Sequence, residues 1–122
     1  MPDQPKHIKR KLRELVGQAY ENELAKELAG LAARFDEWRA GKISAGELSS
    51  LVHKYEIGPS RRLYSTYVDS SLLEVLIASA IVRGVIDEKD LPAEVMPYLQ
   101  NALAFYREYI ETDDGDSTEQ GG

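Results

Sequence analysis

Apolar residues recur every three or four positions through the first third of the chain. The intervening residues are mostly good helix formers, and the spacing is that of one face of an α-helix. The pattern predicts one amphipathic helix from about residue 5 to about residue 40. At about 1.5 Å per residue this helix is about 50 Å long, which exceeds what a compact domain of this size requires. The series consists of Ile8, Leu12, Leu15, Ala19, Leu24, Leu28, Leu31, Phe35 and Trp38.

Boundary signals place the other helices. Gly41 is a typical helix stop, and Ser44 with Glu47 matches the capping box that opens a new helix. Residues from about 70 to 84 are apolar on nearly every side, so we expect a helix buried at the centre of the fold. The last helix is expected to begin near Pro97. No segment alternates with period two, so the prediction is an all-α, compact bundle of about five helices.

The chain has 122 residues, which suits one domain. We expect residues 1–111 to form a single helical domain. Residues 112–122 are acidic, rich in glycine and almost without apolar side chains, so we expect a disordered tail. The apolar run at 72–86 contains two charged residues and is shorter than a bilayer span of about 20 residues, so no membrane partner is expected.

The chain contains no cysteine, which excludes disulfides and thiolate metal sites. Together with the lack of an apolar leader, this favours a cytoplasmic protein. The net charge of −6 disfavours broad, nonspecific binding of nucleic acid. A nucleic-acid-associated protein is still an alternative, because four basic residues open the first helix. The other interpretation is that these residues form a solvated helix end without a ligand. These residues are Lys6, Lys9, Arg10 and Arg13.

The turn after the first helix has several residues of a calcium-binding loop at the appropriate positions. Positions one, six, eight, nine and twelve of residues 36–47 are Asp36, Gly41, Ile43, Ser44 and Glu47. The segment therefore resembles the loop of the EF-hand family, which implies a calcium site. Positions three and five normally supply oxygen ligands, but they are Trp38 and Ala40. We therefore expect no metal and no cofactor, because a helix stop and a capping box explain the same residues.

A cluster of polar and aromatic residues follows the second predicted helix. His53, Arg61, Arg62 and Tyr64 are the types that bind a phosphate or carboxylate, so a small-anion sensor or an enzyme is an alternative function. The other interpretation is the edge of a packed helix face. The sequence contains no glycine-rich phosphate loop and no nucleophile elbow, and this favours a protein without catalytic activity.

The leading hypothesis is a noncatalytic protein-interaction or regulatory module that acts through the long first helix. Helices of three to four turns cover only part of its apolar stripe, and large exposed stripes usually meet a partner. The beginning of the helix is expected to be the uncovered part. We expect a homodimer or another protein to contact it at Ile8, Leu12 and Leu15.

Overall fold

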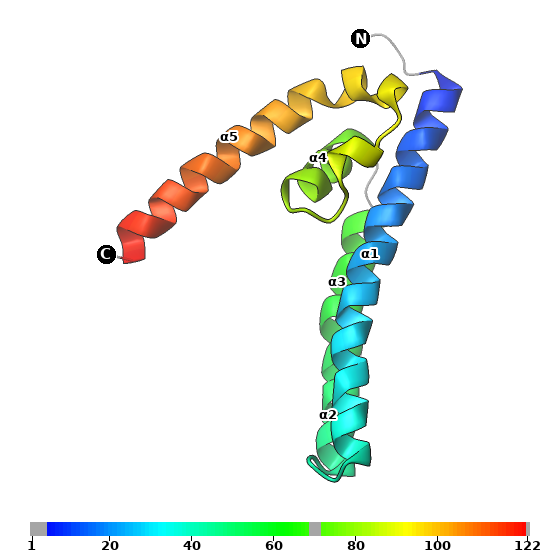
Figure 1. Ribbon diagram of the computed structural model, residues 1–122, viewed down its shortest axis with the longest axis vertical. Coiled ribbons are helices and arrows are strands. Elements are labelled where there is room, and N and C mark those ends of the chain that lie inside the picture. The colour runs from blue at the N-terminus through cyan, green and yellow to red at the C-terminus, as the bar shows by residue number, and fades with distance from the viewer. Residues whose placement is uncertain (1–4, 69–71, 122) are drawn as a thin grey trace. The chain divides into compact units, whose positions relative to one another are not determined.

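The computed structural model describes residues 5–68 and 72–121, with side chains as far as Glu108. The described ranges contain α-helices and short 3₁₀ and π segments and no β-strand, so the all-α prediction is confirmed (Figure 1). A π segment, η1 (Glu56–Ser60), joins α2 to α3 without a break, so the five α-helices form four rods. The α-helices are α1 (Lys6–Arg39), α2 (Ala45–Tyr55), α3 (Arg61–Tyr67), α4 (Leu73–Val82) and α5 (Met96–Gly121).

The helices group into two compact units. One unit contains Met1–Ala19 and Leu72–Gly122, and we call it the terminal unit. The other contains Tyr20–Ser71, and we call it the hairpin unit. Helix α1 runs through both units as one continuous helix of 34 residues. Its length, which the sequence predicted, is thus divided between two sets of neighbours.

Most of the buried apolar side chains lie in the terminal unit. Helix α4 packs against α5, and Ile77, Ala78 and Ala80 of α4 are completely buried. This agrees with the predicted apolar helix, whose described part begins at Leu73; residues 69–71 lie outside the described ranges. The buried side chains of this unit's other segments belong to Ile8, Leu12, Val16, Ala19, Ile86, Leu91, Val95, Leu99 and Leu103.

Two short 3₁₀ segments connect α4 to α5. They are η2 (Glu88–Asp90) and η3 (Ala93–Val95). Salt bridges link them to the neighbouring helices. Lys11 Nζ lies 3.1 Å from the Glu94 carboxylate, and the Arg107 guanidinium lies 2.5 Å from the Glu88 carboxylate. Both pairs are partly exposed, so they contribute little to stability compared with the buried apolar residues.

Glycines end both α1 and α4 in the same way. Gly41 has φ = 77° and Gly84 has φ = 80°, a left-handed conformation that is strained for residues with a Cβ. The next amide, at Lys42 or Val85, donates a hydrogen bond of 2.8 Å to a carbonyl five residues earlier. This is the Schellman arrangement, which satisfies carbonyls at the end of a helix. The predicted helix stop at Gly41 is thereby confirmed.

The capping box at the start of α2 is also confirmed. The Glu47 amide donates to Ser44 Oγ over 3.0 Å, and the Ser44 amide donates to the Glu47 carboxylate over 3.2 Å. Each bond satisfies an amide that the helix itself leaves without a partner. Backbone hydrogen bonds and the capping box therefore explain the conformation of the turn between α1 and α2.

The hairpin unit consists of the second part of α1 and the antiparallel rod α2–η1–α3 (Figure 1). Pro59 lies within η1 and has no amide hydrogen for the helical bond. The wider π turn accommodates it and adds the equivalent of one extra residue, about 100° of rotation. Without that rotation, Leu63 and Tyr67 would turn away from the side on which Leu48 is buried. With it, all three side chains are buried.

Helix α5 is longer than expected. It begins at Met96, close to the predicted start at Pro97, and its backbone is helical as far as Gly121. Pro97 is tolerated because the first amides of a helix have no partner within the helix. Side chains beyond Glu108 are not described, so the tail expected at residues 112–122 stays a prediction. Within the described ranges, no helix combines the length and apolar character needed to cross a bilayer.

Candidate functional site

The predicted contact residues at the beginning of α1 are largely covered by the chain itself. Ile8 is 2% exposed, Leu12 is completely buried, and Leu15 is half-buried. The premise that this end of α1 is left without an intramolecular partner was wrong. Residues 72–122 form a compact unit with this end of α1 and cover it, and α5 in that unit is longer than the three to four turns expected of the other helices. The exposed part of the apolar stripe therefore lies elsewhere.

Apolar residues remain exposed on the part of α1 that belongs to the hairpin unit. Leu28 is 46% exposed and Trp38 is 42% exposed, while Leu31 and Phe35 between them are half-buried. With Leu24, these residues are separated by steps of four, three, four and three. Those steps are the heptad spacing with which one helix packs along another. We call these five residues the α1 seam.

Two hollows flank Leu31 on opposite sides of α1. The first has a volume of about 380 Å³ and opens between α1 and the second rod, lined by Glu27, Gly30, Leu31, Arg34, Leu51, Lys54, Tyr55 and Pro59. The second has a volume of about 290 Å³ and is lined by α1 alone, through Leu28, Leu31, Ala32, Phe35, Asp36 and Arg39. Gly30 and Ala32 are two positions apart, about 200° around the helix, so the two hollows face different ways.

The rod α2–η1–α3 adds an apolar residue on the side of the second hollow, which Leu28 helps to line. Val52 is 37% exposed on α2. It lies about 200° around α2 from Lys54, which lines the other hollow, so Val52 is on the side of Leu28 and Phe35. We call Leu28, Leu31, Phe35, Trp38 and Val52 the apolar face of the hairpin.

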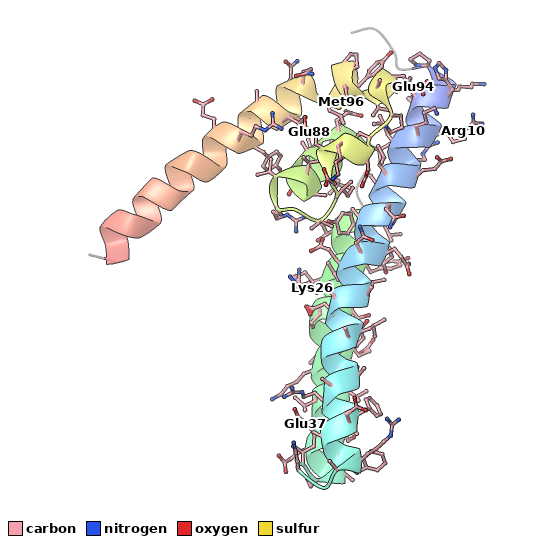
Figure 2. All side chains as sticks on the ribbon, viewed as in Figure 1. Arg10, Lys26, Glu37, Glu88, Glu94 and Met96 are labelled. Atoms are coloured by element: carbon pink, nitrogen blue, oxygen red, sulfur yellow. The ribbon has the colours of Figure 1, made fainter. Side chains whose placement is uncertain are left out.

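The opposite side of α1 is polar. Figure 2 labels Lys26 and Glu37 along the same stretch of helix. They are eleven positions apart, which is close to three full turns, so they share one side. Lys26 is exposed, and Glu37 forms a salt bridge of 2.7 Å with Arg34. This side of the helix therefore carries charged side chains among exposed alanines such as Ala33, whereas the α1 seam carries the large apolar side chains.

Polar contacts join the two arms of the hairpin at the end away from the turn. The Tyr67 hydroxyl donates a short hydrogen bond to the Glu23 carboxylate. The Tyr67 ring lies 5.9 Å, centroid to centroid, from that of Tyr20. Between this end and the turn, Arg62 lies 3.7 Å from Glu27 in an exposed salt bridge. These contacts fix how α3 lies against α1 and hence which residues the apolar face presents.

The predicted anion-binding residues lie on α2 and α3, outside the three hollows found among the described residues. His53 is exposed on α2, and Tyr64 is 53% exposed on α3. Arg61 pairs with Glu56 at 3.4 Å, and Arg62 points to α1, as described above. None of these four residues lines a hollow described here. Their role in binding a small anion stays a prediction.

The predicted basic patch lies on the first turns of α1. Lys6, Lys9, Arg10 and Arg13 are all exposed, as expected for a solvated helix end and equally for a docking patch. In the EF-hand-like turn, Asp36 pairs with Arg39 at 3.1 Å, and Glu47 is held in the capping box. Among the described residues, no group of three or more metal-ligating side chains gathers at one point.

A third hollow lies in the terminal unit, where it occupies about 440 Å³ near the end of α4. It is lined by Ile81, Val82, Gly84, Ile86, Asp87, Glu88 and Arg107. Its polar groups already have partners: Arg107 binds Glu88, and the Asp87 carboxylate accepts the Lys89 amide over 3.0 Å. These pairings explain the polar lining through structural contacts alone.

The sequence contained the signal for the apolar face, because Leu28 and Trp38 belong to the stripe that predicted α1. What it did not reveal was which part of the stripe would be covered. Comparison of the chain with profiles of known protein families, with curated proteins and with solved structures finds no match. The function is therefore inferred from the physical character of these surfaces.

Proposed function

We propose that the protein is a noncatalytic interaction module that binds a polypeptide partner through the apolar face of its hairpin. The observation that carries the proposal is the exposure of Leu28 and Trp38 on a regular heptad seam. Contiguous apolar surface costs free energy in water, about 25 cal/mol for each Å², and a second helix that packs along the seam recovers that cost.

The composition of the hairpin's interior supports the same function. Among the described side chains of the hairpin, only those of Leu48, Leu63 and Tyr67 are buried. Two helices packed side by side can each bury one narrow stripe, whereas a bundle of three or four helices encloses a core. A partner helix on the apolar face would supply the missing layer.

The alternatives from the sequence have less support. A nucleic-acid-binding role rests on the four exposed basic residues at the start of α1, without an accompanying groove-reading element. A small-anion sensor or enzyme requires convergent polar groups in a pocket, and the Arg61, Arg62 and His53 side chains line none of the three hollows found among the described residues. The apolar face has exposure, spacing and chemistry that all favour the same kind of ligand.

Site-specific photo-crosslinking in the cells that make the protein tests the proposal. A photoreactive residue at position 28 is expected to give a defined covalent adduct with another polypeptide. The same residue at position 26, where Lys26 faces the polar side of α1, serves as the matched control. Adducts of equal yield at both positions, or no adduct at position 28, would refute docking through the apolar face.

A further inference from the structure

We infer that the partner on the apolar face is a second copy of this chain, so that two hairpins pack into a four-helix bundle. The inference deepens the proposed function and rests on it. It names the occupant, and three observations select that occupant: the charge of the hairpin, the size of its face and the incompleteness of its interior.

The first observation is electrostatic. Residues 20–68 contain seven acidic and seven basic side chains, so this part of the hairpin is neutral although the whole chain carries −6. A neutral surface with both signs interspersed does not repel its own copy, and a net charge near zero promotes self-association. A partner that is strongly acidic or strongly basic would find no complementary field on this surface.

The second observation is size. The hairpin part of α1, from Tyr20 to Arg39, is 20 residues long and therefore spans about 30 Å. Two helices side by side are about 20 Å wide, so one face of the hairpin covers on the order of 600 Å² in projection. A stable protein interface buries about 800 Å² of accessible surface on each partner. The corrugated surface of one hairpin face is of that size.

The third observation concerns geometry. A twofold dimer uses the same patch on both copies, so an apolar contact between them requires a patch that is apolar along the length of that contact. The α1 seam meets this condition, because Leu28 and Phe35 alternate with Leu31 and Trp38 along about three turns. Small residues beside the seam, Ala25 and Ala32, allow close approach of a second helix. Two hairpins joined in this way enclose the side chains that one hairpin leaves half-exposed.

Light scattering over a range of protein concentrations, read beside the fluorescence of Trp38, tests the inference. Trp38 is the only tryptophan of the chain, so its emission reports directly on the apolar face. At tens of micromolar we expect a mass of about 27 kDa, twice the 13.7 kDa of one chain. Dilution should return the monomer mass and shift the Trp38 emission to longer wavelength.

Two double variants separate this surface from other modes of association. Leu28→Lys with Val52→Lys places two charges on the apolar face and is expected to weaken dimerisation at least about 30-fold, the loss of about one interface hot spot. Ala33→Lys with Ser50→Lys adds the same charges on the opposite, exposed sides of α1 and α2, because Ala33 lies two turns after Lys26 and Ser50 lies about 200° from Val52, and it should leave the dimer unchanged. Circular dichroism establishes that both variants are helical.

A wild-type monomer at 100 µM or so overturns the inference, and so does a dimer that Leu28→Lys with Val52→Lys leaves intact. The crosslinking experiment then decides the fate of the proposed function. An adduct at position 28 with a different polypeptide retains the interaction module and refutes only the second copy as partner. A wild-type monomer with no adduct at position 28 refutes both.

Discussion

Tyr67 and Glu23 are 44 positions apart in the chain, yet the hydroxyl of Tyr67 donates a hydrogen bond to the Glu23 carboxylate. The bond joins α3 to α1 at the open end of the hairpin, where no covalent turn holds the helices together. The tyrosine is almost completely buried, with 4% of its surface exposed. The contact is therefore shielded from water on one side.

Tyr67→Phe is expected to lower the free energy of unfolding by about 1.5–3 kcal/mol. A hydrogen bond to a charged group contributes about this much, and the loss of the hydroxyl leaves the ring packing intact. Urea denaturation followed by circular dichroism measures the change. Tyr64→Phe is the matched control, because Tyr64 is more than half exposed. Equal effects of the two substitutions would show that the bond to Glu23 contributes nothing.

Ser44→Ala removes the side-chain acceptor of the capping box and should destabilise the protein by about 1 kcal/mol. The same substitution at Ser49, which is exposed in the interior of α2, should be neutral or slightly stabilising, because alanine is the better helix former. The two midpoints of urea denaturation give the comparison. If Ser49→Ala were the more damaging substitution, the helix start would have to lie elsewhere.

Leu12→Ala is expected to cost about 3 kcal/mol of stability, because Leu12 is completely buried and its truncation leaves a cavity. Leu28→Ala should cost less than about 1 kcal/mol in the monomer, because almost half of Leu28 is already exposed. Both values are measured by urea denaturation at low protein concentration. A small effect at Leu12 would restore the hypothesis that the beginning of α1 is a contact surface.

The loop of residues 36–47 is expected not to bind calcium at physiological concentrations. Trp38 and Ala40 provide no oxygen at two ligand positions, and the Glu47 carboxylate accepts the Ser44 amide. Isothermal titration calorimetry measures the affinity. Micromolar or tighter binding that Glu47→Gln abolishes would contradict this prediction.

Deletion of residues 112–122 is expected to leave the fold intact, because this segment has no apolar side chain that can join a core. The melting temperature of the shortened chain should lie within about 5 °C of that of the full chain, a difference of roughly 1 kcal/mol. A larger fall would mean that the last turns of α5 contribute to the packing of the protein.

Local sequence patterns predicted the helices and their ends, whereas packing between distant parts of the chain determined which apolar side chains stay exposed. The apolar period defined α1 to within one residue at each end, and the signals at Gly41 and Ser44 located the following turn. These features depend only on residues that are close together in the chain, so they can be predicted directly from the sequence. The burial of Leu12 depends instead on residues more than sixty positions away, and no local signal shows which half of a long stripe they cover. The π segment at Pro59 was likewise hidden, since proline equally suits the first turn of a new helix.

That π segment gives the second arm of the hairpin one residue more than a straight α-helix would need to keep Leu48 and Leu63 on one side. Deletion of Pro59 would remove the residue that lacks an amide hydrogen, and with it the surplus residue of the π turn. The shortened arm would then be an ordinary α-helix with the same side chains inward. A deletion at Ser50, in contrast, would carry every residue before or after it about 100° around the axis. The hairpin thus has one place where the chain can change its length without changing which residues face inward.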